Sequence, residues 1–271
     1  MTSSAGLANL PAYVDLSQYN PTVGNQGNVL SCTAWATGYY LRGWYAKRDG
    51  YYPVGYNGND SFSPMYTYSQ IVGGNNEGTS FAANLNIQKE GIDTREDYSQ
   101  GDFNYEQLPS SEEMWNAANW KIAGYNDVSN PGGTGMENWV ETSLASGNPV
   151  AVALPVYPEF DNLGLSTNYL VNPPIGNEQS RGGHAVFAYK YDQNGLWIEN
   201  SWGANGGDNG YGELSWSFVN QYVGEAVNMA PIAGPKQPSP TPPPATPAPA
   251  PATPVGTPTR PIHIKCGTKC V

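Results

Sequence analysis

Residues 26–35 read Gln26-Gly27-Asn28-Val29-Leu30-Ser31-Cys32-Thr33-Ala34-Trp35, a loop of small and polar residues that runs directly into an apolar stretch. From Cys32 onward, apolar or small residues recur with the i, i+3, i+4, i+7, i+8 spacing of one helix face. They are Trp35, Ala36, Tyr39, Tyr40, Gly43 and Trp44. Ser31 is a suitable N-cap, so we expect Cys32 in the first turn of this helix. The partial positive charge of a helix N-terminus favours thiolate, the nucleophilic form of cysteine.

Cysteine is scarce elsewhere in the chain. The other two cysteines, Cys266 and Cys270, lie near the C-terminus, so a disulfide framework is excluded for the body of the protein. Taken alone, one cysteine beside an apolar helix face is also compatible with a small buried hydrophobic residue. The residues that could act with Cys32 decide between these interpretations.

The chain of 271 residues is long enough for one large core or two small ones and has a net charge of −11. The segment from Pro235 carries four cations and no carboxylate, so the charge of the remainder is four units more negative, −15. Such a body should repel nucleic acid and anionic membrane surfaces. No apolar run approaches the ~20 residues that span a bilayer, and we see no signal peptide.

The first half of the chain reads as helices separated by loops. Residues 10–16 form an extended lead-in, Ser63-Pro64 begins a helix through about Val72, and residues 79–90 form a helix that ends at Gly91. After about Trp120 the pattern changes to short strands, with one helix from Gly135 to Ser146. Strands are expected at 121–125, 149–157, 184–191, 196–200, 211–216 and 226–229. The strand at 184–191 alternates as if half-buried, and a hairpin turn at 192–195 joins it to the next strand.

This pattern predicts an α+β fold of two lobes within residues 1–234. The helical lobe spans about 20–115, and an antiparallel β-barrel-like lobe spans about 116–230 together with the lead-in. Residues 235–261 hold 12 of the 24 prolines and predict an extended linker, followed by a short basic terminus at 262–271.

His184 is the only histidine before this linker, and it follows Gly182-Gly183, where the backbone can pass close to another group. A cysteine nucleophile needs a base within hydrogen-bond reach, and His184 is the sole candidate in the body. The hairpin should bring Asn200 beside it, where the amide oxygen can hold the imidazole tautomer. Trp202 can shield that hydrogen bond from water. Taken alone, His184 is equally compatible with a structural histidine at the end of a strand.

Three motifs together resemble the papain-like cysteine peptidases. They are Gln-Gly-x-x-x-Ser-Cys-x-Ala-Trp from Gln26, Gly-His-Ala-Val from Gly183, and Asn-Ser-Trp-Gly from Asn200 with Asn-Gly-Tyr-Gly after it. The similarity runs from about Leu10 to Met229, with the motifs in the family's order. It implies the papain-like fold, with the active-site cleft between the two lobes.

The resemblance implies a role for four residues. Cys32 would be the nucleophile, His184 the base and later the acid, and Asn200 the residue that orients the imidazole. Gln26 would donate its side-chain amide to the oxyanion beside the backbone N–H of Cys32. A solvated turn residue and a turn-capping asparagine are the alternative interpretations of Gln26 and Asn200.

For substrate binding, the resemblance implies a glycine of the helical lobe that pairs with the substrate backbone. Gly78 matches best, although Gly73-Gly74 competes, and we add Gly183 and Trp202. The sequence departs from the family at Thr33, where a tryptophan usually follows the cysteine. The disulfides usual in the helical lobe are also impossible here, and residues 57–62 are a candidate for the missing tether.

The sequence thus predicts a cysteine peptidase that acts on polypeptides as a monomer, without cofactor or metal and with a mildly acidic to neutral pH optimum. Two alternatives remain: an inactive papain-fold binding module, or a cysteine amidase or acyltransferase acting on non-protein amides. The tail favours a secreted or cell-surface protein and is a candidate for attachment to another surface or for occupying the cleft. Its residues His263, Cys266 and Cys270 fall one short of the usual four metal ligands, and a disulfide or attachment site is favoured there.

Overall fold

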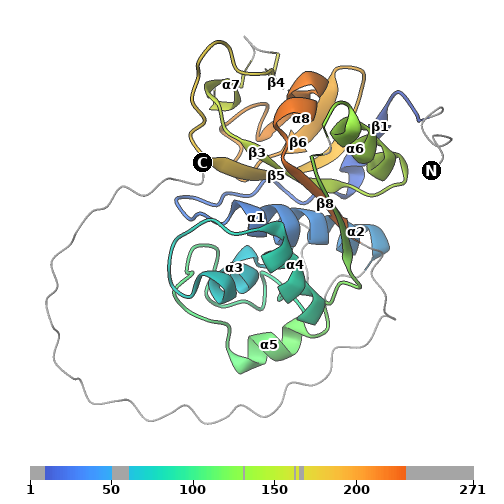
Figure 1. Ribbon diagram of the computed structural model, residues 1–271. Helices are drawn as coiled ribbons and strands as arrows, with labels where there is room; N and C mark the ends of the chain where they lie inside the picture. Colours follow the sequence, from blue (N-terminus) through green and yellow to red (C-terminus); the bar gives the residue numbers. More distant parts are fainter. Residues whose placement is uncertain (1–9, 51–60, 131, 162, 165–167, 230–271) are drawn as a thin grey trace, which may run out of the picture.

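The computed structural model describes residues 10–50, 61–130, 132–161, 163–164 and 168–229. In chain order the elements are β1 (Val14–Asp15), the 3₁₀ turn η1 (Ser17–Tyr19), α1 (Cys32–Ala34), the π-helical segment η2 (Trp35–Arg42), α2 (Gly43–Asp49), α3 (Pro64–Val72), α4 (Phe81–Glu90), α5 (Ser111–Ala117), β2 (Tyr125–Ser129), α6 (Gly135–Ala145), β3 (Val150–Pro155), α7 (Pro158–Asp161), β4 (Leu170–Val171), β5 (Gly183–Tyr191), β6 (Gly195–Glu199), β7 (Tyr211–Ser215), α8 (Trp216–Tyr222) and β8 (Glu225–Met229). Figure 1 shows a β-rich part with α6, α7 and α8, and a helical part with α3, α4 and α5. The helix that begins at Cys32 lies between them.

The helix that begins at Cys32 runs without a break through α1, η2 and α2 to Asp49. We expected one apolar face, but the residues from Ser31 to Ala46 are buried on every side. The sheet covers one side of this helix, and α3 and α4 cover another, so no face of η2 reaches solvent. Helices that are enclosed in this way lose the polar stripe of a surface helix. The tyrosines among these residues satisfy their hydroxyls inside the protein, as Tyr40 does with the carbonyl of Asn200 at 2.7 Å.

The predicted helices of the first half are confirmed, with small shifts at their ends. α3 begins at Pro64 as expected, and α4 begins at Phe81 after the N-cap Ser80, whose side chain accepts from the N–H of Ala83 at 3.2 Å. The short helix α5 was missed, although Ser110 and Glu113 form a reciprocal capping box at its start. Within the second half, the helix expected at 135–146 is α6, whereas α7 and α8 were missed.

Among the described residues, eight strands form one sheet in the order β2-β8-β3-β5-β6-β7-β4, with β1 paired to β5. All pairs are antiparallel except β4 and β7, and the ends of this order are not joined, so the sheet is open rather than closed into a barrel. The hairpin expected at 192–195 is confirmed, since β5 and β6 pair from Tyr191 and Leu196 back toward Phe187 and Glu199. The strand expected at 121–125 lies instead at β2, where Tyr125–Ser129 pairs with β8.

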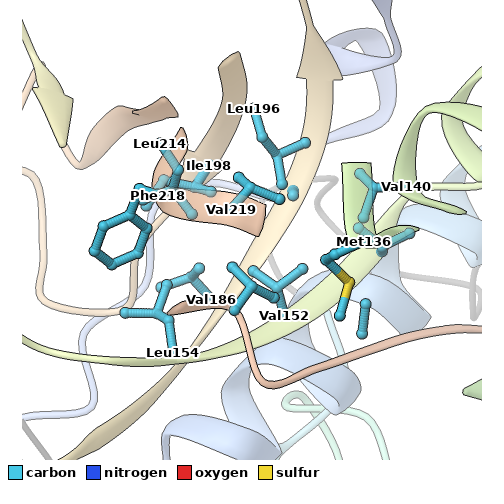
Figure 2. Packing of buried hydrophobic residues seen from close by; sticks show 14 of the residues in the cluster. Met136, Val140, Val152, Leu154, Val186, Leu196, Ile198, Leu214, Phe218 and Val219 are labelled. Carbon is cyan, nitrogen blue, oxygen red and sulfur yellow. The ribbon is translucent and has the colours of Figure 1, made fainter. Parts of the chain in front are cut away.

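The central strands are buried on both faces, which corrects the half-buried pattern expected for residues 184–191. One face of the sheet packs against α6 and α8, and Figure 2 shows this cluster. Its labelled members are Met136, Val140, Val152, Leu154, Val186, Leu196, Ile198, Leu214, Phe218 and Val219. On the opposite face Ala185 and Phe187 share a second cluster with Cys32, Trp35 and Tyr39. A third cluster, within the helical part, includes Met65, Tyr68 and Ile92.

None of the helices in the described residues is both long and apolar enough to cross a membrane. The expected linker at 235–261, the terminus at 262–271 and the 57–60 part of the expected tether lie outside the described residues. The division into two lobes at about residue 115 stays a prediction.

Gly91 marks a close approach between α4 and α5, and we expect its replacement by alanine to be costly. The residue has φ +141°, and a Cβ there would overlap the carbonyl oxygen of Ala117. Gly91→Ala should lower the free energy of unfolding by about 2–5 kcal/mol, through backbone strain and overpacking together. Gly73→Ala is the control, because Gly73 has φ +56° but open space around it. It should cost only about 1 kcal/mol in urea denaturation. Equal losses would show that the close approach carries no cost.

Candidate active site

Cys32 lies where the sequence analysis placed it, at the first residue of α1. The preceding residue, Ser31, occupies the N-cap position as expected, but its side chain makes no capping hydrogen bond and its Oγ is buried without a partner. Cys32 has 2% of its surface exposed and packs beside β5 in the cluster that contains Ala185. The helical run and the sheet therefore meet at the cysteine.

His184 and Asn200 are joined directly, as the hairpin predicted. Nε2 of His184 lies 2.8 Å from Oδ1 of Asn200, and the backbone N–H of Ser201 donates to the same oxygen at 2.8 Å. An amide oxygen only accepts, so Nε2 carries the proton and Nδ1 is the basic nitrogen of the ring. Nδ1 is buried and has no hydrogen-bond partner, so the structure does not join it to Cys32 by a hydrogen bond. Such bonds are often long in the absence of substrate.

Two aromatic rings enclose the imidazole of His184. Trp202 stacks on it with ring centroids 4.6 Å apart and an interplanar angle of 29°. Phe160, on α7, packs edge-on against both His184 at 5.8 Å and Trp202 at 5.3 Å. Trp202 lies over the imidazole, and its expected role of shielding the His184–Asn200 hydrogen bond from water stays a prediction. Phe160 was missed, because nothing in the sequence links α7 to the histidine.

This enclosure changes the acid–base behaviour of His184. The residue is 3% exposed, and burial lowers its pKa to about 4 because the charged imidazolium loses its hydration. The hydrogen bond to Asn200 acts in the opposite direction, and the positive charge of Arg181 lowers the pKa further. The ring is therefore neutral, and able to accept a proton, over most of the physiological pH range.

Gln26 is fixed from both parts of the molecule. Its Oε1 accepts from the hydroxyl of Ser201 at 2.7 Å, and its backbone N–H donates to the carbonyl of Ser201 at 2.7 Å. At the other end of the side chain, Nε2 donates one of its two hydrogens to the carbonyl of Val29 at 2.9 Å. Gln26 is 2% exposed and is not a solvated turn residue. Ser201 was missed as a site residue, although it lies inside the Asn-Ser-Trp-Gly motif.

Comparison with known proteins identifies the family of the chain. The model of the papain family of cysteine proteases matches residues 10–231. The chain belongs to this family. A peptidase C1-like protein of Acanthamoeba polyphaga mimivirus is 33% identical over 82 residues, which cover 30% of this chain and 26% of the viral protein. The chain thus matches only about a quarter of the length of that relative.

Solved structures of papain-like proteases share the fold. Xylellain, a cysteine protease from Xylella fastidiosa, superposes with a TM-score of 0.72 at 22% identity over 86% of this chain and 91% of its own. Digestive procathepsin L 3 of Tenebrio molitor superposes with a TM-score of 0.58 at 22% identity, over 85% of this chain and 73% of its own. Bromelain from Ananas comosus, in complex with the inhibitor E64, superposes with a TM-score of 0.56 at 20% identity, over 81% of this chain and 98% of its own. The papain-like fold expected from the sequence is confirmed.

Thr33, where the papain family usually has tryptophan, joins a buried polar network. Its Oγ1 hydrogen-bonds with that of Thr79 and accepts from Nδ2 of Asn84 at 3.1 Å. Asn84 also donates to Thr79 at 2.9 Å and accepts from Thr67 at 2.9 Å. The residue after Cys32 is thereby tied to the segment that follows Gly78.

The three residues expected to bind substrate lie at different places. Gly78 is exposed and directly precedes Thr79, whereas the competing pair Gly73-Gly74 lies at the opposite end of the same loop. This arrangement favours Gly78. Gly183 is exposed at the start of β5, opposite Pro155. Trp202 is occupied by its contact with His184, and a role in substrate binding stays a prediction.

Within the described residues, no group of three or more His, Cys, Asp or Glu side chains is arranged to hold a metal ion. The residues considered for a metal at the C-terminus, His263, Cys266 and Cys270, lie outside the described part of the chain.

A buried carboxyl group lies at the end of β6, directly before Asn200. Glu199 is fully buried, its Oε2 accepts from Asn20 at 2.9 Å, and its Oε1 has no partner. Burial raises the pKa of Glu199 well above its ordinary value, while Asn20 and the charge of Lys47 act in the opposite direction. The carboxyl group is therefore held in its neutral form at a pH where an exposed glutamate is ionised.

We expect Glu199→Gln to gain stability relative to wild type as the pH rises. Below pH ~4 the carboxyl is protonated in both states. At higher pH the unfolded chain releases the proton while the folded chain retains it, so wild-type stability falls, whereas glutamine cannot ionise. The relative gain should be about 1 kcal/mol or more between pH 4 and pH 8 in urea denaturation. Glu106→Gln, at an exposed loop position, is the control. A difference between Glu199→Gln and wild type that is constant over this range would contradict the expectation.

Proposed function

We propose that this papain-family protein is a cysteine peptidase in which Cys32, His184, Asn200 and Gln26 carry the reaction. The observation that supports this most strongly is the hydrogen bond from His184 Nε2 to Asn200 Oδ1. It leaves the basic Nδ1 of a neutral imidazole without a hydrogen-bond partner. Gln26, which is hydrogen-bonded to Ser201 and to the carbonyl of Val29, supplies a fixed amide donor.

In the proposed reaction, Nδ1 of His184 takes the thiol proton as Sγ of Cys32 attacks the scissile carbonyl carbon. The carbonyl electrons move to oxygen, and the oxyanion accepts hydrogen bonds from Gln26 Nε2 and from the backbone N–H of Cys32. N–H groups in the first turn of a helix have no acceptor within the helix, and the helix dipole favours negative charge there.

Collapse of this intermediate breaks the peptide C–N bond and leaves a thioester on Cys32. The departing amine takes its proton from His184, which then accepts one from water as the water attacks the thioester. Collapse of this second intermediate breaks the C–S bond and releases the carboxylic acid, and the proton on His184 returns to the sulfur of Cys32. The Asn200 oxygen keeps the ring in one tautomer, and the stacked Trp202 excludes water from that hydrogen bond. Polypeptides are the proposed substrates, and a monomeric enzyme stays a prediction.

Labelling and turnover together test this proposal. Wild-type protein should react once with E64, the inhibitor bound in the bromelain structure, and should hydrolyse a fluorogenic dipeptide amide. Cys32→Ala should do neither. Labelling without peptide hydrolysis would favour an amidase or acyltransferase that acts on non-protein amides. Absence of both in wild type would favour the inactive binding module.

Gln26→Ala should lower kcat by about 10²–10³-fold, because one preorganised oxyanion donor is lost. KM should change little, since the substrate carbonyl binds the donor less strongly than the oxyanion does. Ser17→Ala, on the exposed turn η1 in the lead-in, is the matched polar-to-alanine control. A loss of less than threefold for Gln26→Ala would remove this residue from the mechanism.

The acid limb of the pH profile of kcat/KM should report the protonation of His184. Because burial lowers the pKa of His184 to about 4, activity should fall only as the pH drops through about 4, where the base becomes protonated. Arg181→Gln should move this limb to higher pH, since the cation that disfavours imidazolium is removed. Lys121→Gln, at an exposed position in the segment before β2, should leave the limb in place. A limb near pH 6.5 in wild type would show that burial does not control the base.

A further inference from the structure

Asn76 connects the loop between α3 and α4 to the loop that leads into Cys32. Its Nδ2 donates to the carbonyl of Asn28 at 3.1 Å, and its Oδ1 accepts from the backbone N–H of Leu30 at 2.8 Å. The two bonds cross 48 and 46 residues of sequence. One amide side chain therefore holds both neighbours of Val29.

Val29 is the residue that holds the side chain of Gln26. Its carbonyl accepts from Gln26 Nε2 at 2.9 Å, and its N–H donates to the carbonyl of Gln26 at 3.2 Å. Val29 is itself 6% exposed and packs in the apolar cluster of the helical part. A rotation of the peptide unit after Val29 would therefore turn the Gln26 amide away from its present direction.

Asn76 is in turn held by a helix rather than by the loop alone. The hydroxyl of Tyr68, a fully buried residue of α3, lies 3.0 Å from Oδ1 of Asn76 and 2.9 Å from the carbonyl oxygen of Glu77. The backbone N–H of Glu77 donates to the same hydroxyl at 3.1 Å. The contacts run from α3 through Tyr68 to Asn76, and from Asn76 to the two peptide units that flank Val29. The carbonyl of Val29 then holds Gln26.

We propose that Asn76 is a positioning residue for oxyanion stabilisation. It fixes the peptide units on either side of Val29 and thereby the direction in which Gln26 presents its amide. This inference rests on the proposed peptidase function. The contact involves no thiol, so it holds the two loops together independently of the redox conditions. We expect loss of Asn76 to lower the rate strongly, because a displacement of ~1 Å at a catalytic group costs ~10²-fold in rate.

Asn76→Ala should lower kcat for a dipeptide amide by about 10–100-fold and change KM by less than threefold. Alkylation of Cys32 by iodoacetamide should slow by less than threefold, because that reaction forms no oxyanion. The control is Asn75→Ala, the neighbouring loop position, whose Nδ2 donates only locally to the carbonyl of Val72 at 3.3 Å. It should match wild type in both assays. Asn76→Asp keeps the acceptor but loses the donor, and an intermediate loss of kcat is expected.

A double-mutant cycle with Gln26→Ala separates positioning from a general structural effect. If Asn76 acts through Gln26, Asn76→Ala should cost less than twofold in the Gln26→Ala background. An equal loss in both backgrounds, or a parallel loss of alkylation rate, would overturn the inference. The same holds if Asn76→Ala and Asn75→Ala behave alike in an active enzyme. If wild type and Cys32→Ala are equally inactive, the proposed function fails first, and this inference falls with it.

Discussion

The helix from Cys32 to Asp49 is enclosed by the sheet on one side and by α3 and α4 on another, and this enclosure sets the position of the candidate nucleophile. A helix buried all round cannot rotate or slide without opening voids in tightly packed clusters. Polar residues on it must find partners inside the protein, as Thr37 does with the carbonyl of Thr33 at 2.7 Å. Enclosure has an energetic cost at Arg42, which is buried over the ring of Phe62 and has two guanidinium nitrogens without a hydrogen-bond partner. Burial lowers its pKa to about 10.

The second constraint is the set of hydrogen bonds that join the segment after β6 to the loop before this helix and to Tyr40 within it. Gln26 is bonded to Ser201 through both backbone and side chain, Gly203 donates to the carbonyl of Gly24 at 2.9 Å, and Tyr40 donates to Asn200. These contacts join residues separated by about 160–180 positions in the sequence, and none of them involves a cysteine. The segment that carries Cys32 and the segment that carries Asn200 are therefore aligned by ordinary hydrogen bonds. The hydrogen bond between the side chains of Ser201 and Gln26 is buried, which makes it costly to break.

The sequence was sufficient for the features that depend on short-range chemistry. The turn at 192–195 joins β5 to β6 as expected, and Asn200, the residue directly after β6, hydrogen-bonds with His184. The pairing of the two strands shifts between Ala188 and Lys190, which the sequence did not predict. Spacing also located the start of the helix at Cys32. What it missed depends on tertiary contacts: the hydroxyl of Ser201, the ring of Phe160 and the amide of Asn76 come from segments without periodic pattern. The one-face expectation failed for a related reason. Tyr45 lies outside the expected face, and its hydroxyl finds the partners Asn148 and Met229 only in the folded protein.

The loop between α3 and α4 illustrates how a fold can keep its site geometry after a change in the usual packing. Thr33 replaces a large aromatic side chain with a small hydroxyl, and the network with Thr79 and Asn84 uses that hydroxyl fully. Buried polar networks stabilise one conformation only when every member has a partner. Thr79 holds one end of the segment in this way, and Asn76 holds the other. The backbone at Gly78 lies between two fixed points, Asn76 and Thr79, and both connect to the segment that carries Cys32. A substrate that paired with this glycine would therefore meet a backbone already aligned with Cys32.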